Sequence, residues 1–250
     1  MKVSVITICF NAEDTIEDTI KSVLSQNYNK LEYIIKDGGS NDNTLKIIDQ
    51  YKDKITKIIS CKDEGLYDAL NQAITSATGD VIGFIHADDV FYDESVISTI
   101  AKAFDQKDVH AVYGDLQYVY KNDTSKVYRN WKALSYKEGM FLKGWMPPHP
   151  TFYVRREVYN KFGLYNTTFK SAGDYELMLR YIHKYRISLH YIQKVLVKMR
   201  VGGKSNVTFK NRIRANMEDR RAWKINGLTP SAFTLLKKPL SKLGQFLKKE

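Results

Sequence analysis

Acidic side chains follow two apolar runs of the chain, at points where buried strands would end. Asp88 and Asp89 come shortly after Val81–Ile85, and Asp37 comes directly after Leu31–Lys36. Two adjacent carboxylates repel each other unless a cation or hydrogen-bond donors lie beside them. Carboxylate oxygens suit Mg²⁺ or Mn²⁺, and Mg²⁺ usually completes its coordination with water and substrate phosphates. The pair therefore indicates a metal-bound nucleotide diphosphate, with a simple helix cap by Asp89 as the alternative.

Asp37 and two side chains of a predicted helix could contact such a nucleotide. Asp37 is followed by Gly38 and Gly39, which let the backbone approach a ligand, so its carboxylate can accept an N–H from a base such as uracil. Asp68 and Asn71 stand three apart on one face of a predicted helix, outside its apolar stripe, where they could bind sugar hydroxyls or the metal shell. A turn at Asp37 and a solvated helix face at Asp68 are the alternatives.

Asp174 stands at the predicted start of a helix in the second half of the chain. A carboxylate there is stabilised by the helix dipole and often serves only as a cap. Beside a sugar-nucleotide site it becomes the candidate general base, because an inverting transfer needs one group to accept the proton of the acceptor hydroxyl. His149, between two prolines, is either a loop residue or a neighbour of the acceptor.

Strands and helices are expected to alternate over the first hundred residues. Apolar runs indicate strands at 3–9, 31–36, 55–60 and 81–85, and apolar residues at helical spacing indicate helices at 13–26, 45–51, 65–77 and about 96–104. This alternation predicts an α/β fold with a Rossmann-like, doubly wound and mostly parallel sheet. The strands would end at one edge of that sheet, which is where ligands bind in such folds.

The pattern changes after residue 110. A hairpin at 111–120 and 126–128, a Gly/Pro-rich loop at 144–150, a short strand at 151–155, a helix at about 174–185 and strands near 189–192 and 195–201 are expected there. We therefore predict a catalytic domain at 1–203, made of a nucleotide-sugar half (1–110) and an elaborated acceptor half (111–203). A basic helical tail at 204–250 would follow.

The composition restricts the class of protein. The chain has 250 residues, of which 43% are hydrophobic and 27% charged, so it can bury a core and is neither a disordered chain nor a disulfide-rich mini-protein. Cys9 and Cys61 are expected to be reduced thiols of a cytosolic protein. We expect no signal peptide, and no apolar run approaches the roughly 18 residues that a membrane span requires.

Positive charge is concentrated at the C-terminal end. From residue 204 onward we count 12 basic and 3 acidic residues, a balance of +9, which leaves only +2 of the net +11 for the rest. Within this tail, Leu236, Leu240, Leu243 and Leu247 have helical spacing, with lysines between or beyond them. Such a basic amphipathic helix can lie on an anionic membrane surface or bind nucleic acid. A helix packed on the domain is the alternative.

Several segments in this order resemble the family-two glycosyltransferases. They are Val3–Asn11, Ser22–Gln26, Asp37–Ser40, Asp68–Asn71, Asp88–Asp89 and Ala172–Glu176, and the resemblance runs from Val3 to about Arg180. It implies the GT-A fold and inversion of the anomeric centre. It also places the chain near bacterial enzymes that assemble O-antigen or exopolysaccharide repeat units.

The resemblance also implies roles for individual residues. They are Phe10, Asn11, Asp37, Asp68, Asn71 and Asp88 for the nucleotide sugar, Asp89 for Mn²⁺ or Mg²⁺, and Asp174 as the catalytic base. Phe10 would flank the uracil, Asp37 would accept its N–H, and Asp88 would hold the ribose or sugar. His86 stands where the family often has Asp or Asn, so its imidazole either shifts the metal preference or points away.

The expected function is transfer of a hexose, glucose or galactose, from a UDP-sugar to a lipid-linked acceptor such as GlcNAc-diphosphate-undecaprenol. The product would carry a β-linkage, and we predict β-1,3. The enzyme would lie in the cytoplasm at the inner membrane, where the basic tail would hold it to the anionic surface. No nucleic-acid partner is expected. A GDP-sugar remains an alternative to the UDP-sugar as the donor. The alternatives are a non-catalytic nucleic-acid- or membrane-binding protein and a sugar-1-phosphate nucleotidyltransferase, whose Gly-rich basic loop is missing after Ile8.

Overall fold

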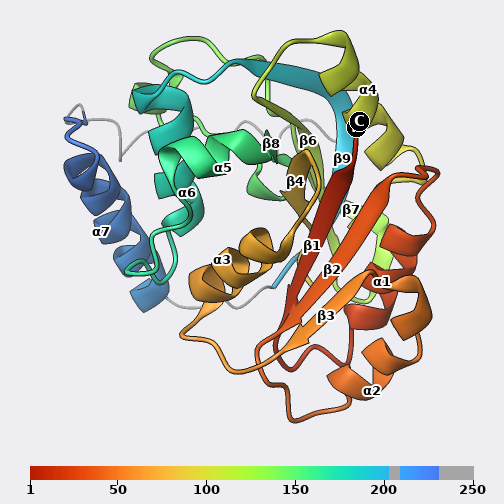
Figure 1. The fold of residues 1–250 in the computed structure, drawn as a ribbon. Coiled ribbons are helices and arrows are strands. Elements are labelled where there is room, and N and C mark those ends of the chain that lie inside the picture. The colour runs from red at the N-terminus through yellow and green to blue at the C-terminus, as the bar shows by residue number, and fades with distance from the viewer. Residues whose placement is uncertain (203–208, 231–250) are drawn as a thin grey trace.

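In the computed structural model of the chain, which describes residues 1–202 and 209–230, strands and helices alternate through the first half as predicted (Figure 1). The elements are β1 (Val3–Cys9), α1 (Ile16–Leu24), β2 (Leu31–Asp37), α2 (Thr44–Asp49), a 3-10 turn (Lys52–Lys54), β3 (Lys57–Ser60), α3 (Leu66–Ser76), β4 (Val81–Phe84) and α4 (Val96–Gln106). The predicted α/β order is confirmed.

The four strands β1 to β4 are parallel, and their carboxyl ends meet at one edge of the sheet. Cys9 pairs with Asp37 between β1 and β2, and Asp37 pairs with Ser60 between β2 and β3. The strand order is β3-β2-β1-β4, so the chain adds strands on one side of β1 and then crosses to the other side. This switch point is where an open α/β sheet binds its ligand.

The second half extends the same sheet with strands of mixed direction. Its elements are β5 (Asp89–Phe91), β6 (Ala111–Tyr120), β7 (Asp123–Trp131), 3-10 turns at Met140–Lys143 and His149–Thr151, β8 (Tyr153–Arg155), α5 (Arg156–Phe162), α6 (Gly173–Met178) with a π-helical continuation (Leu179–Lys184), β9 (Leu189–Arg200) and α7 (Phe209–Ile225). The two strands predicted near the end are one strand, β9, with a register irregularity opposite β6. β5 was not predicted, because three residues carry too little periodicity to identify a strand.

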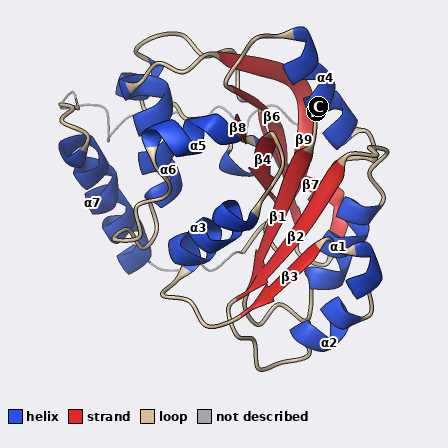
Figure 2. Ribbon diagram, viewed as in Figure 1, coloured by secondary structure: helices blue, strands red, loops and turns tan. Residues whose placement is uncertain are grey.

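Helices cover both faces of the sheet, as a doubly wound fold requires. Figure 2 shows α1, α2 and α4 on one face and α3, α5, α6 and α7 on the other. Two apolar clusters fill the space between these layers and the strands, one on each face. The described part of the chain contains no helix of the length and apolar character that would let it cross a bilayer.

The helix α7 belongs to the body of the protein, which differs from the predicted boundary at residue 203. Ala222 and Trp223 are buried in the same cluster as the α6 side chains. The Trp223 indole N–H donates to the Tyr175 hydroxyl at 2.7 Å. The prediction of a basic helical tail at 204–250 did not separate this helix from the rest of the tail. The amphipathic helix predicted within 233–247 lies outside the described residues.

Candidate active site

Side chains from four separate elements converge where β4 ends. His86 follows β4, His149 lies in a 3-10 turn, Tyr67 lies in α3 and Asp174 in the first turn of α6. The ring centroids of His86 and His149 are 5.5 Å apart, and the Tyr67 hydroxyl donates to Asp174 Oδ2 at 3.5 Å. Burial and the electrostatic interaction with the His149 imidazole lower the pKa of His86, although Asp174 and Asp88 oppose this. A neutral imidazole is the form that binds metal ions.

Burial also changes the acidity of Asp174. It raises the pKa of this carboxyl group above its ordinary value, and the charge of His86 and the hydrogen bond from Tyr67 only partly oppose the rise. A general base works best when its pKa approaches the operating pH. The raised pKa therefore suits the role predicted for Asp174.

A glycine brings Tyr67 close to the start of α6. The Gly173 N–H donates to the Tyr67 hydroxyl at 2.8 Å, and a Cβ atom at this position would lie 2.6 Å from Tyr67 Cζ. Any larger residue would push the ring away from Asp174. The glycine before the carboxylate is thus part of the geometry of the site.

Asp88 and Asp89 face different surroundings. Asp88 is half-buried, and its charge acts on His86. Asp89 is fully buried, and neither of its carboxylate oxygens has a hydrogen-bond partner within the described part of the chain. Burial and the charge of Asp88 raise the pKa of Asp89. The backbone N–H and the positive charge of Arg200 favour the ionised carboxylate and only partly oppose this rise. The Asp89 carboxylate is therefore enclosed while Asp88 is half-buried, and the metal role predicted for Asp89 stays a prediction.

A second group of residues gathers at the ends of β1 to β3. The Phe10 ring is 53% exposed, and Asp63 follows β3. A Cβ atom on Gly38 would lie 2.8 Å from Asp63 Oδ2 and 3.4 Å from Phe10 Cδ2. An open aromatic face, a glycine backbone and a carboxylate therefore lie together, which is a surface suited to a nucleotide base. Asp63 was not among the residues predicted to contact the nucleotide, although its place after a third strand at this edge could have identified it.

Asp37 is fully buried and shapes this loop from beneath. Its Oδ2 atom accepts hydrogen bonds from the backbone N–H of Gly39 at 2.9 Å and of Ser40 at 3.1 Å, and from the Ser60 hydroxyl at 2.9 Å. These donors occupy the carboxylate, which leaves no exposed oxygen for a base. The predicted contact between Asp37 and uracil is therefore unsupported, and Asp63 is the carboxylate beside Phe10.

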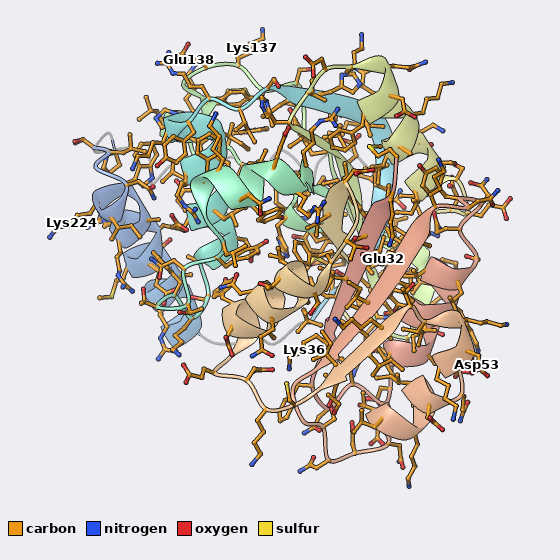
Figure 3. All side chains as sticks on the ribbon, in the orientation of Figure 1. Glu32, Lys36, Asp53, Lys137, Glu138 and Lys224 are labelled. Carbon is orange, nitrogen blue, oxygen red and sulfur yellow. The ribbon has the colours of Figure 1, made fainter. Side chains whose placement is uncertain are left out.

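Lys36, which is labelled in Figure 3, connects Asp63 to the sheet through an ion pair. It is fully buried at the end of β2, and its Nζ atom donates to the carbonyl oxygens of Asp37 at 2.8 Å and Cys61 at 2.7 Å and to Asp63 Oδ2 at 3.1 Å. A lysine inside a strand pattern is expected to be exposed, so only the tertiary structure shows this role.

We expect Lys36→Met to lower the free energy of unfolding by about 3 kcal/mol, because removing one partner leaves buried acceptors and a partly buried carboxylate without a donor. Urea unfolding at pH 7 measures this change. Lys57→Met is the matched control, since Lys57 is exposed on the neighbouring strand β3, and its effect should stay within about 0.5 kcal/mol. Equal stability of the two variants would contradict the buried role of Lys36.

Two other predicted contact residues, Asp68 and Asn71, have structural partners of their own. Asp68 Oδ2 accepts hydrogen bonds from the Glu64 N–H at 3.0 Å and from Gln72 Nε2 at 2.9 Å. The Asn71 amide exchanges two hydrogen bonds of 2.9 Å with the backbone of Tyr165, which ties α3 to the loop before α6. These bonds use the polar atoms of Asn71 and one oxygen of Asp68, so the predicted sugar contacts of both residues are unsupported.

Asn11 also joins two loops at the ends of neighbouring strands. Its N–H donates to the Ser40 hydroxyl at 2.8 Å, and its Oδ1 atom accepts from the Asn41 N–H at 2.9 Å. Its φ angle of 50° is in the left-handed region, which asparagine tolerates better than most residues. Asn11 therefore holds the loop that carries Phe10, and its predicted contact with the nucleotide sugar remains a prediction.

The donor set suits a divalent ion that is shared with a substrate. In residues 1–202 and 209–230, no group of three or more His, Cys, Asp or Glu side chains is arranged so that it could hold a metal ion. Asp88 and the neighbouring imidazole of His86 offer one carboxylate and one nitrogen ligand, so a substrate would have to complete the coordination. Mg²⁺ is commonly held by one or two carboxylates together with substrate phosphates, and imidazole is also accepted by transition metals.

The chain has a doubly wound half with polar strand-end loops and a mixed-sheet half that carries a candidate base. This is the arrangement of a GT-A glycosyltransferase. Residues 4–170 match the model of the family described as Glycosyl transferase family 2, and the chain belongs to this family. This membership confirms the resemblance found in the sequence. It also disfavours the nucleic-acid-binding and nucleotidyltransferase alternatives.

Curated relatives and solved structures agree with the family. An uncharacterized glycosyltransferase of Mycobacterium tuberculosis is 31% identical over 183 residues, which are 71% of this chain and 68% of the relative. The putative glycosyltransferase EpsE of Bacillus subtilis is 30% identical over 190 residues, or 73% and 67% of the two chains. The structure of S. aureus TarS with UDP-GlcNAc has a TM-score of 0.69 at 17% identity and covers 99% of this chain and 72% of its own.

A mannosyltransferase of Pyrobaculum calidifontis, solved with GDP-Man and Mn²⁺, also shares the fold. Its TM-score is 0.66 at 18% identity, and the match covers 97% of this chain and 69% of that one. These two structures confirm the predicted GT-A architecture.

Proposed function

We propose that the chain transfers a hexose from a UDP-sugar to an acceptor hydroxyl with inversion, so that an α-linked donor gives a β-linked product. The observation that carries this proposal is the half-buried Asp174 with a raised pKa, which contacts Tyr67 and interacts electrostatically with His86, as Asp88 also does, at the carboxyl end of β4. A base and a metal-binding carboxylate that share a site are the groups required for a single displacement at a sugar carbon.

Asp174 accepts the proton of the acceptor hydroxyl while that oxygen attacks C1 from the face opposite the leaving diphosphate. The Tyr67 hydroxyl donates to Oδ2 of Asp174, which orients the carboxylate and leaves Oδ1 available for the acceptor. At the other end of the site, Phe10 flanks the base and the partly exposed Asp63 lies beside it, with its Oδ1 atom accepting the Gly65 N–H at 3.0 Å. Lys36 keeps Asp63 in place.

Asp88, with His86 beside it, would hold Mn²⁺ or Mg²⁺ together with the phosphates of the substrate. When bound, the ion neutralises the charge that develops on the leaving nucleotide diphosphate. The mannosyltransferase of the same fold that was solved with Mn²⁺ is consistent with this proposal. Imidazole ligands favour Mn²⁺ over Mg²⁺, since Mg²⁺ prefers oxygen.

A donor panel tests the proposal directly. UDP-Glc, UDP-Gal, UDP-GlcNAc and GDP-Man are each incubated with the protein, Mn²⁺ and a synthetic GlcNAc-diphosphate-lipid, and the product linkage is determined by NMR. We expect glucose or galactose to be transferred from UDP with a β-1,3 linkage. GDP-Man is included because relatives of this fold were solved with either nucleotide. An α-linked product would rule out the inverting mechanism.

The acceptor in this proposal is a sugar on a polyprenyl diphosphate, as in O-antigen or exopolysaccharide synthesis, and the protein acts at the cytoplasmic face of the inner membrane. The charge distribution supports this, because the last 47 residues carry +9 of the net +11. A basic segment is attracted to anionic lipids, which would bring the site to a lipid-linked acceptor.

Deletion of Phe233–Glu250 is expected to weaken binding to anionic vesicles at least about tenfold, since each basic residue near the surface contributes about 1 kcal/mol. Sedimentation with phosphatidylglycerol-containing vesicles measures the bound fraction, with pure phosphatidylcholine vesicles as the control. Turnover of a water-soluble acceptor should be unaffected by the deletion. Unchanged partitioning would show that the tail is not the membrane-binding segment.

A further inference from the structure

The turn that leads into α6 is held by a side chain from a distant helix. Glu218, in α7, accepts hydrogen bonds from the backbone N–H groups of Lys170 at 3.0 Å, Ser171 at 2.8 Å and Ala172 at 2.9 Å, and from the Ser171 hydroxyl at 3.0 Å. Only 9% of its surface is exposed. The carboxylate is therefore enclosed by donors from three consecutive residues, 46 to 48 positions away in the chain.

The turn before α6 needs such an acceptor. Lys170, Ser171 and Ala172 precede Gly173, the first residue of α6, so their N–H groups have no acceptor within that helix. Such groups cost free energy when they are buried unpaired. Hydrogen bonds from backbone N–H groups to a carboxylate are shorter and stronger than neutral ones.

The ionisation state of Glu218 agrees with this role. Burial tends to raise its pKa, but the hydrogen bonds from Ser171, Lys170 and Ala172 outweigh burial, so the pKa lies below the ordinary value of a glutamate. Glu218 is consequently a carboxylate at neutral pH. An amide in its place would keep the size of the side chain, but it would lose the negative charge and one acceptor oxygen.

Further contacts make α7 and α6 a single unit. Trp223 donates to the Tyr175 hydroxyl at 2.7 Å, and Asn226 Nδ2 donates to Glu176 Oε1 at 3.0 Å. Both partners are next to or near Asp174 in α6. Figure 1 shows α7 beside α6 on the outer side of the molecule, away from the strands.

Asp174 is therefore supported from two sides. The Tyr67 hydroxyl accepts the Gly173 N–H and contacts Asp174 itself, and Glu218 holds the three residues that precede Gly173. We infer that Glu218 is a positioning residue for the catalytic base, acting through the Lys170–Ala172 turn without touching the substrate. This inference rests on the proposed role of Asp174.

Glu218→Gln tests the inference, with Met217→Gln as the matched control because Met217 is 67% exposed on the same helix. Displacing a catalytic group by about 1 Å can cost about 100-fold in rate. We therefore expect Glu218→Gln to lower kcat by about 10- to 100-fold. The donor KM and the Kd for UDP or GDP should change less than about twofold, because the base subsite lies at other strand ends. Met217→Gln should match the wild type.

A double-mutant cycle separates positioning from general damage. If Glu218 acts through Asp174, adding Glu218→Gln to Asp174→Asn lowers the residual turnover no further, since interacting sites are not additive. Effects that multiply would overturn the inference, as would wild-type kcat in a folded Glu218→Gln protein. If Glu218→Gln fails to bind UDP or GDP, Glu218→Asp is measured instead, because aspartate keeps the charge but has a shorter side chain. Wild-type kcat in Glu218→Asp overturns the inference. A reduced kcat with an unchanged nucleotide Kd supports it.

The same cycle distinguishes this inference from the proposed function. Full turnover by Asp174→Asn alone refutes the base assignment, whatever Glu218→Gln does. An inactive Asp174→Asn beside a fully active Glu218→Gln refutes only the positioning role.

Discussion

Asp174→Asn is expected to lower kcat by about 1,000-fold while nucleotide binding is retained, because a positioned general base contributes about 10²- to 10⁴-fold to a rate. Asparagine has the same shape as aspartate but cannot take the proton of the acceptor hydroxyl. The Kd for UDP or GDP, measured by calorimetry, should stay close to the wild-type value, since Phe10 and Asp63 lie at the ends of other strands. Asp105→Asn, an exposed position at the end of α4, serves as the control.

The pH dependence of kcat gives a second measurement of the same group. Burial raises the pKa of Asp174, so the carboxylate is protonated, and the base lost, at a higher pH than for an exposed aspartate. In the wild type, kcat should therefore decrease as the pH falls through this raised pKa. The residual activity of Asp174→Asn should lack that decrease. Wild-type activity in this variant would remove the central element of the proposed mechanism.

Asp88→Asn is expected to lower kcat/KM at a fixed Mn²⁺ concentration by about 100- to 1,000-fold, since a metal ion contributes several kcal/mol at the leaving group and each 1.36 kcal/mol is tenfold in rate. Activity measured against Mn²⁺ concentration should also shift to higher concentrations. Chelation with EDTA should abolish turnover in the wild type, and Mn²⁺ should restore it.

The neighbouring carboxylate provides the control. Among the residues that the structure describes, the Asp89 carboxylate is enclosed without hydrogen-bond partners, so Asp89→Asn should change the Mn²⁺ requirement far less than Asp88→Asn does. A neutral amide at this position removes a buried ionisable group, and the variant should fold as well as the wild type. If Asp89→Asn instead has the larger effect on Mn²⁺ dependence, the metal ligand is Asp89, and its carboxylate must become accessible when substrate binds.

The sequence by itself determined the elements of the first half and the edge at which they end. Apolar runs of strand length and apolar residues at helical spacing are local properties, and they predicted β1 to β4 and the helices between them. Parallel strands bring their carboxyl ends together wherever they pair, so Asp37, Asp88 and their loops were expected at one edge. The motif order then indicated the family, which the comparison confirmed.

Only the tertiary structure decided which carboxylates could meet a ligand and what holds the base. Asp37 and Asp63 lie on neighbouring strand ends, yet one is saturated by Gly39, Ser40 and Ser60 while the other stands beside Phe10. The direction of a loop side chain depends on partners that are distant in the chain, and no local period records them. The bonds from Lys36 to Asp63 and from the Lys170–Ala172 turn to Glu218 span 27 and 46 to 48 residues, which is why the sequence pattern could not show them.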